Sequence, residues 1–214
     1  MLERAVAVSM DDLEVGKAEY MRAVELLRAL NATRELAVAT HDLGLLAMQR
    51  GDYASSHELI QESIQLAREN LDVGTEANAT GTLGFIELGE GQFDRAKELL
   101  LEALELERGI DHLNLGSANN LVGLAAIAAS HKDFENACFF VGAYDAHREL
   151  IGASHETFIR DLLERVLAQV SQHLGGEEIE KAKARGAELS LAEAVDRTLA
   201  ERSAGSVTVG ARSW

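Results

Sequence analysis

Proline is absent from this 214-residue sequence, and cysteine occurs once, at Cys138. Because no proline forces a helix to break, each joint between helices must rely on glycine, asparagine or aspartate. A lone cysteine cannot form an internal disulfide or a cysteine-based zinc cluster. Aromatic residues make up only 5% of the chain, although apolar residues, many of them alanine and leucine, make up 47%. This composition favours helices packed closely against helices.

Positive charge is also scarce. The chain has 20 Lys and Arg residues and 36 Asp and Glu residues, and its formal net charge is -16. Such a surface repels phosphate backbones, so we expect no direct nucleic-acid binding. A basic peptide or the cationic face of a partner protein fits better, although acidity that only maintains solubility fits equally well. The N-terminus lacks the pattern of a secretory signal, and no apolar run is long enough to cross a bilayer. We therefore expect a cytoplasmic protein without membrane contact.

A pattern of small and aromatic residues recurs about every forty positions. Each copy has a small residue, an aromatic residue nine positions later and another small residue three positions after that. A small residue within a helix allows a neighbouring helix to approach closely, and the aromatic residue is expected to fill the corner between two antiparallel helices. The three copies consist of Gly44, Tyr53 and Ser56, of Gly84, Phe93 and Ala96, and of Ala125, Phe134 and Ala137.

The order Leu43-Gly44, then Gly51-Asp52-Tyr53, then Ser56 resembles the tetratricopeptide repeat, a helix-turn-helix unit of about 34 residues. The period here is longer, which predicts one or two additional turns in each helix. The resemblance implies an all-α fold, namely a right-handed α-solenoid of stacked antiparallel helix pairs.

We expect one helical repeat domain over residues 1–202 and a flexible tail over 203–214. Tyr20 is assigned to the corner of the first unit, and Tyr144 stands where the repeat has a small residue, which predicts a wider crossing. The expected segments are a short helix at 2–14, a partial first unit at 18–49, repeats at 34–70, 75–108 and 111–151, and terminal cap helices at 154–202.

Within the predicted cap, Ser154 is expected to begin a helix that ends near Leu174, before the Gly175-Gly176 pair. Ser190 and Glu193 have the spacing of a capping box, which predicts a last helix to about Glu201. Such terminal helices cover the apolar face that the end of a repeat array would otherwise expose.

The region from about Leu121 to Leu199 is similar to the C-terminal arm of large bacterial signal-transduction ATPases, a family that includes LuxR-type and SARP-type transcriptional regulators. The runs that carry the similarity are 121–128, 141–152, 174–175 and 186–195. In that family an effector domain and an NTPase switch precede a helical arm that senses ligands or partners. The chain contains neither an NTPase segment nor a DNA-reading domain. An excised arm and a stand-alone relative therefore both remain open.

No motif for catalysis is complete. His57-Glu58 begins a zinc-protease motif, but Gln61 stands in place of the second histidine. His155-Glu156 fails in the same way at Ile159, and no glycine-rich phosphate loop with its lysine is present. We therefore expect no enzymatic activity, no metal site and no cofactor.

The tetratricopeptide resemblance implies a partner-binding groove on the first helix of each repeat. The groove is mainly apolar and lacks the basic clamp that holds a terminal carboxylate, so an apolar or amphipathic helix or peptide fits better. Met48 and Phe85 have an alternative role in packing, and His41 an alternative role as an ordinary hydrogen-bonded histidine. The candidate groove residues are His41, Leu45, Met48, Phe85, Leu88, Asn119 and Val122.

Three functions remain open at this stage. The first is a protein-protein interaction scaffold that acts as the regulatory arm of a bacterial signalling ATPase or transcriptional regulator. The second is a sensor that encloses a small-molecule effector, with His41, Phe85 and Asn119 near the pocket. The third is a self-association module that forms a homodimer through the first repeat.

Overall fold

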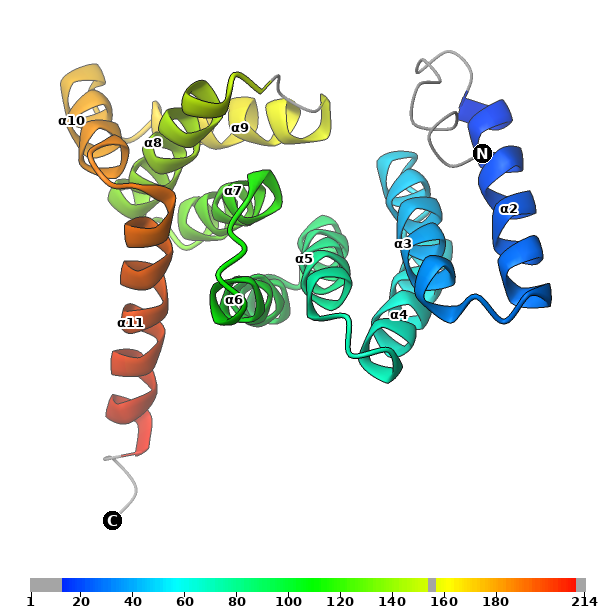
Figure 1. The fold of residues 1–214 in the computed structure, drawn as a ribbon. Helices are drawn as coiled ribbons and strands as arrows, with labels where there is room; N and C mark the ends of the chain where they lie inside the picture. The colour runs from blue at the N-terminus through cyan, green and yellow to red at the C-terminus, as the bar shows by residue number, and fades with distance from the viewer. Residues whose placement is uncertain (1–12, 154–156, 211–214) are drawn as a thin grey trace. The chain divides into compact units, whose positions relative to one another are not determined.

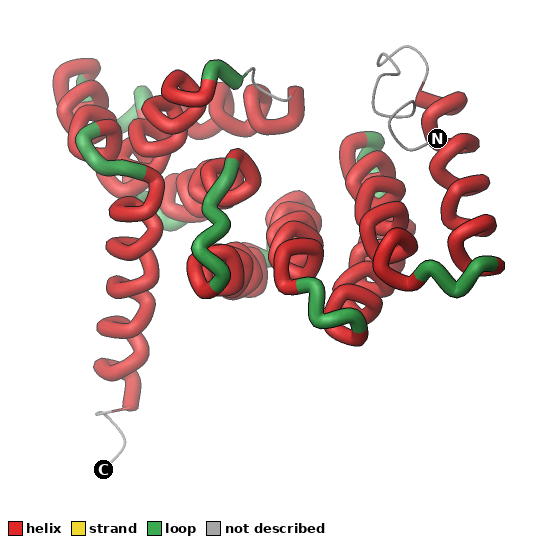
Figure 2. The backbone as a smooth tube through the Cα atoms, in the orientation of Figure 1, coloured by secondary structure: helices red, strands yellow, loops and turns green. Residues whose placement is uncertain are grey.

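The computed structural model describes residues 13–153 and 157–210. Within these residues the chain forms ten α-helices and no β-strand (Figures 1 and 2). The predicted all-helical class is therefore confirmed for the described chain. The helices are α2 (Leu13–Ala29), α3 (Thr33–Gln49), α4 (Tyr53–Glu69), α5 (Val73–Gly89), α6 (Phe93–Gly109), α7 (Leu115–Ser130), α8 (Phe134–Ile151), α9 (Thr157–Val170), α10 (Gly176–Ala187) and α11 (Leu191–Gly210).

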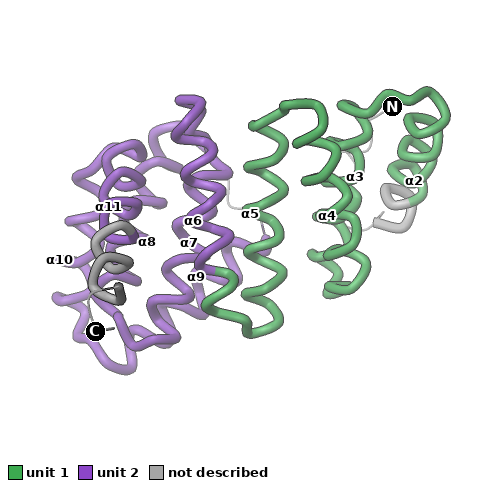
Figure 3. Tube along the Cα trace, turned by 90° about the horizontal axis from the view of Figure 1, so that it is seen from below, with its two compact units in different colours: residues 1–96 green, residues 97–214 purple. Residues whose placement is uncertain are grey.

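The helices fall into two compact units, residues 1–96 and residues 97–214 (Figure 3). In unit 1, consecutive helices pack in sequence order, α2 on α3, α3 on α4 and α4 on α5. In unit 2, α7 packs on α8, α9 packs on both of them, and α10 and α11 pack on α8. No helix among the described residues is long and apolar enough to span a membrane.

The helices from α2 to α6 are each 17 residues long. Three residues join each of them to the next, and the middle residue of every connection has a positive φ. The forty-residue pattern in the sequence thus consists of two halves with the same corner geometry. The positive-φ residues are Asn31, Gly51, Leu71 and Gly91, and the connections after α6 and α7 have Asp111 and Lys132 in the same conformation.

In the connections after α3, α4 and α7, an aspartate follows the positive-φ residue; its amide bonds to the end of one helix and its carboxylate caps the start of the next. The Asp52 amide donates to the Ala47 carbonyl at 3.0 Å, and the Gly51 amide donates to Met48 at 2.9 Å. These two bonds form a Schellman motif, which satisfies the last carbonyls of α3. The Asp52 carboxylate in turn accepts the Ser55 amide of α4 at 3.2 Å. Asp72 and Asp133 occupy the same position at the starts of α5 and α8.

Tyr20 does not lie at a corner, which corrects the sequence assignment. It lies within α2, is 8% exposed, and belongs to a buried cluster with Leu36 and Leu43. The residue of α2 in register with Tyr53 and Phe93 is Leu13, at which the helix begins. The first connection therefore follows the same spacing as the later ones.

The crossing of α3 and α4 brings small residues together. A Cβ atom on Gly44 would lie 2.8 Å from Ile60 Cδ1, so any larger residue there would force the buried Ile60 side chain to shift. The Ser56 hydroxyl donates to the Gly44 carbonyl at 2.7 Å, and the Ser63 hydroxyl donates to Ala37 at 2.7 Å. Both hydroxyl groups are fully buried, and these bonds satisfy them between the two helices.

The closest helix contact described in unit 2 joins α8 and α10. A Cβ atom on Gly186 would lie 2.0 Å from the Phe139 carbonyl oxygen, so the two backbones touch at this position. Tyr144, where we predicted a wider crossing, is 1% exposed within α8. The wider helix crossing at Tyr144 stays a prediction.

The C-terminal helices differ from expectation in their bounds. α9 ends at Val170, earlier than the expected Leu174, and Gly175 is the residue that precedes α10. The capping box is confirmed, since the Ser190 amide donates to Glu193 Oε2 at 2.8 Å and the Glu193 amide donates to Ser190 Oγ at 3.3 Å. α11 continues to Gly210, which places residues 203–210 of the expected tail in a helix. The expected helix at 2–14 falls largely outside the described residues, as do Ser154 and the tail over 211–214.

Candidate functional site

The predicted groove residues divide between the two units. In unit 1, His41, Leu45 and Leu88 are half-buried, whereas Met48 is 3% exposed and Phe85 7% exposed. This burial supports a packing role for Met48 and Phe85, the alternative that the sequence left open. In unit 2, Asn119 is half-buried and Val122 is fully buried. A partner-binding role for this set stays a prediction.

The residues of the forty-residue pattern also differ in burial: the small residues are buried, and the aromatic residues are partly exposed. Gly84 is buried, and Tyr53 and Phe134 are half-buried. The Phe134 ring stacks on His173 with the centroids 4.4 Å apart, so this corner aromatic residue contacts the turn after α9. Phe93 is 36% exposed. The small residues Ala96, Ala125 and Ala137 are all fully buried.

His41 connects two helices of unit 1. Its Nε2 lies 3.0 Å from Thr82 Oγ1 on α5, and its Nδ1 lies 3.3 Å from Asp42 Oδ1. On the other side, burial raises the pKa of Tyr20, and the nearby charge of Asp42 and a hydrogen bond to it raise that pKa further. The chain Tyr20, Asp42, His41, Thr82 therefore links α2, α3 and α5 through polar side chains.

A carboxylate, a histidine and a hydroxyl in series are the residue types of a nucleophilic triad. Thr82 Oγ1, however, donates to the Asn78 carbonyl in its own helix at 3.1 Å, so its proton is already used there. The hydroxyl oxygen is then left to accept a hydrogen bond from His41 Nε2. This arrangement fits a structural hydrogen-bond chain better than an activated nucleophile.

An open apolar pocket of about 330 Å³ lies among α2, α3 and α4 in unit 1. Two positions along a helix rotate a side chain by about 200°, so the pocket residues Leu43 and Leu46 lie on a face of α3 different from that of His41 and Leu45. No small or aromatic residue of the repeat pattern marks this face. The lining residues are Met21, Leu43, Leu46, Ala47, Arg50, Asp52, Ser55, Glu58 and Leu59.

Met21 gives this pocket an exposed apolar edge. It is 47% exposed on α2, whereas the lining residues Leu43 and Leu59 belong to or pack against a buried apolar cluster. Glu58 and Asp52 lie on the opposite, α4 side of the pocket together with Ser55. The surface thus combines an apolar floor with a charged border of two carboxylates, Asp52 and Glu58, and one cation, Arg50.

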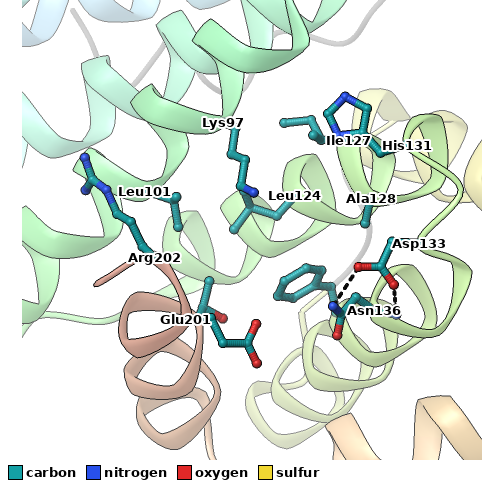
Figure 4. A pocket seen from close by; sticks show the side chains of 12 residues that line it. Lys97, Leu101, Leu124, Ile127, Ala128, His131, Asp133, Asn136, Glu201 and Arg202 are labelled. Atoms are coloured by element: carbon teal, nitrogen blue, oxygen red, sulfur yellow. Dashed lines mark hydrogen bonds between the residues drawn. The ribbon is translucent and has the colours of Figure 1, made fainter. Parts of the chain in front are cut away.

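A second pocket, of about 360 Å³, lies within unit 2 among α6, α7, α8 and α11 (Figure 4). Its apolar surface consists of Leu101, Leu124, Ile127, Ala128 and Phe140. Its polar border consists of Lys97, His131, Asp133, Asn136, Thr198, Glu201 and Arg202. The pocket combines segments about one hundred residues apart, which is why the repeat pattern did not indicate it.

Glu107 is a buried acid of unit 2 outside both pockets. It is 2% exposed, and neither carboxylate oxygen has a hydrogen bond of ordinary geometry. Burial raises its pKa to about 7, while the nearby Ser117 hydroxyl acts in the opposite direction and lowers it. A carboxyl group in this setting is neutral at mildly acidic pH and carries a costly charge above neutrality.

The described residues contain no group of three or more His, Cys, Asp or Glu side chains that could hold a metal ion. The single cysteine, Cys138, is buried in α8, and burial raises the pKa of its thiol. A thiol with a raised pKa is a poor nucleophile at neutral pH.

Comparison with known proteins adds no identity. No protein-family model matches the chain, and no curated protein matches it either.

Proposed function

We propose that the chain is a non-catalytic protein-protein interaction module of tetratricopeptide-like helix pairs, stacked as a right-handed solenoid. Two observations support this fold-level proposal. The same three-residue corner recurs between 17-residue helices, and Gly44 and Ser56 meet at the crossing of α3 and α4. Repeated helix pairs of this kind offer extended surfaces for partners.

The open apolar pocket of unit 1 carries the proposal. An apolar floor with an exposed edge at Met21 is suited to the apolar face of a helix or peptide. The two carboxylates of the border, Asp52 and Glu58, outnumber its one cation, Arg50, and together with the net charge of -16 they favour a partner segment with basic residues beside its apolar face. The proposed partner is therefore a basic amphipathic helix or peptide.

The similarity of the region from Leu121 to Leu199 to regulatory arms suggests the setting for this interaction. We propose that the chain serves as the sensor arm of a bacterial signalling ATPase or transcriptional regulator in the cytoplasm. Partner binding at the arm would then bias the activity of an effector domain. The gene tests this setting, because an NTPase segment in the same reading frame would support it and an unrelated neighbouring domain would contradict it.

Two adjacent leucines of α3 provide a matched test of the binding surface. Leu46 lines the pocket and Leu45 belongs to the predicted groove, and both are half-buried. Leu46→Glu should reduce recovery of the cellular partner with tagged protein at least tenfold, whereas Leu45→Glu should leave it near the wild-type level. The reverse result would assign binding to the predicted groove, and melting curves for both variants control for loss of folding.

A second copy of the chain is the other occupant that this pocket could take. Analytical ultracentrifugation of purified wild-type protein and of Met21→Glu separates the two cases. If the wild-type protein is a monomer at every concentration, the pocket binds a partner other than a second copy of the chain. A dimer that dissociates in Met21→Glu would assign the pocket to self-association.

A further inference from the structure

The pocket of unit 2 in Figure 4 has the composition of a small-molecule site. Its volume of about 360 Å³ lies at the lower end of the range for such sites, roughly 300–1,000 Å³. Leu124, Ile127 and Phe140 form an apolar surface, and charged side chains stand at the border. A small ligand with an apolar body and one charged end would match this division.

Most charges at the border are already engaged. Glu201 accepts from Arg197 Nε at 3.1 Å, and Arg202 Nη1 lies 2.8 Å from Glu105 Oε2. Asp133 accepts from the Asn136 side chain at 2.8 Å. In Figure 4 the Arg202 guanidinium points away from the middle of the pocket, in keeping with its ion pair.

Lys97 is different. It lies on α6, is exposed to solvent, and is one of the residues that line the pocket (Figure 4). Within the described part of the chain, the side chain of Lys97 has no hydrogen bond and no ion pair. The Lys97 ammonium group is exposed to solvent at the border of the pocket, so a ligand in the pocket can reach it without breaking an existing ion pair. An anionic ligand would supply the missing partner.

The charge around the pocket limits this anion to one negative charge. Glu201 and Asp133 border the same cavity, so a phosphate with two charges would meet repulsion from both. A single carboxylate can accept from the Lys97 ammonium group and leave its apolar chain on Leu124, Ile127 and Phe140.

We propose that this pocket binds an amphipathic monocarboxylate, with its carboxylate on Lys97 Nζ and its apolar chain against α7 and α8. This inference does not depend on the proposed partner surface, because the two pockets share no residue and lie in different units. The chain would then bind a small molecule in unit 2 as well as a protein partner in unit 1.

Titration calorimetry with octanoate on the full chain tests the proposal. We expect a dissociation constant on the order of 0.1–1 mM for a ligand of this size. Each methylene removed from the probe should weaken binding about fourfold, because less apolar surface is buried. Raising the salt concentration should weaken binding, since the pairing with Lys97 is partly solvent-exposed.

Lys97→Met keeps an unbranched side chain that is one atom shorter and removes its charge, so it should weaken octanoate binding about tenfold or more. Lys181→Met is the matched control. Lys181 is exposed on α10, outside the pocket, and the substitution changes the net charge equally. A second variant, Ala128→Met, should fill the cavity and block binding without removing a charge.

The competing results are distinct. Equal binding of octanoate and octylammonium would show general apolar adsorption and would overturn the proposal. The same follows if Lys97→Met and Lys181→Met bind equally well, or if Ala128→Met binds as tightly as wild type. Should Lys97→Met fail to fold, the comparison of Ala128→Met with wild type and of octanoate with octylammonium decides the question.

Discussion

Gly142 in α8 faces the backbone of Lys183 in α10 so closely that a Cβ atom on the glycine would lie 2.0 Å from the Lys183 carbonyl oxygen. Gly186 makes the reciprocal approach, with the nearest contact at the Phe139 carbonyl. Two glycines on facing helices thus allow their backbones to touch. The neighbouring ion pair of Lys183 Nζ with Asp145 Oδ2, at 3.1 Å, adds an electrostatic contact beside them.

This relationship predicts that alanine is not tolerated at Gly142. Gly142→Ala would force α8 and α10 apart and should lower the free energy of unfolding by about 1–3 kcal/mol, the usual effect of overpacking. Gly176→Ala is the control in α10, because a Cβ atom there meets nothing within 4 Å. It should leave stability unchanged or raise it slightly. Denaturant unfolding measures both, and equal midpoints would contradict the account.

Leu71 lies at a corner in a conformation that favours glycine. Its φ is 54°, and its side chain is 88% exposed. Removal of that side chain therefore costs the protein little packing. Leu71→Gly should raise the free energy of unfolding by about 0.5–1 kcal/mol, because the left-handed conformation costs a leucine about 1–2 kcal/mol and the added freedom of the unfolded glycine offsets part of this gain.

The equivalent corner at Gly51, with φ of 78°, provides the opposite substitution. Gly51→Leu should destabilise the chain by about the amount that Leu71→Gly stabilises it. Thermal melts of both variants test the common corner geometry. A Leu71→Gly variant that melts below wild type would show that the two corners are not equivalent.

The buried carboxyl group of Glu107 should make the free energy of unfolding depend on pH. Its pKa is raised from the ordinary value of 4.5 to about 7 in the folded chain, chiefly by burial. A group with a raised folded pKa favours folding when protonated, so its contribution is fully present below about pH 4.5 and is lost as the pH rises to about 7. The loss amounts to about 3 kcal/mol.

Glu107→Gln should keep the chain stable across this range, because the amide stays neutral. The stability of the variant relative to wild type should therefore increase between about pH 5 and pH 8. Glu164→Gln, at an exposed position of α9, is the control and should follow the wild-type curve. Parallel curves for wild type and Glu107→Gln, measured by urea unfolding at several pH values, would refute this prediction.

An ion pair joins α11 to α6, beside the buried side chains of Ala194 and Val195. Arg108 donates to Asp196 from Nε at 2.6 Å and from Nη2 at 3.1 Å, and these bonds lower the pKa of Asp196. Asp196→Asn should accelerate amide exchange in α11 severalfold, and high salt should have a similar effect on wild type.

Glu135→Gln is the control, and it removes the exposed ion pair with Arg185. It should leave amide exchange in α10 unaffected because glycine contacts hold that helix. Equal effects on the two helices would contradict this distinction.

The helix pairs could be predicted from sequence because their determinants are local. Gly44, Gly51 and Ser56 recur at a fixed spacing, and the Ser190 capping box lies within four residues. Tyr20 lies 33 positions before Tyr53, close to the ordinary tetratricopeptide period of about 34, and this spacing favoured a corner there. The start of α2 at Leu13 carries no glycine or aromatic residue to mark it.

The contacts of α10 and α11 could not be predicted, since they join positions far apart without a repeated pattern. Arg108 and Asp196 are separated by 88 positions, and Gly142 and Gly186 resemble ordinary helix glycines in sequence. The unit 2 pocket depends on both helices that flank it, α6 and α11. Sequence alone therefore indicated helices there but not the cavity they enclose.

Photo-cross-linking in cells tests the central claim, that the chain binds a partner through the apolar pocket of unit 1. A benzophenone side chain is placed at Met21, 47% exposed at the pocket edge, or at Leu150, 82% exposed in unit 2. We predict one dominant adduct from position 21 that Leu46→Glu abolishes, and no such adduct from position 150. Equal adducts from both positions, or an adduct at 21 that Leu46→Glu leaves intact, would contradict the account.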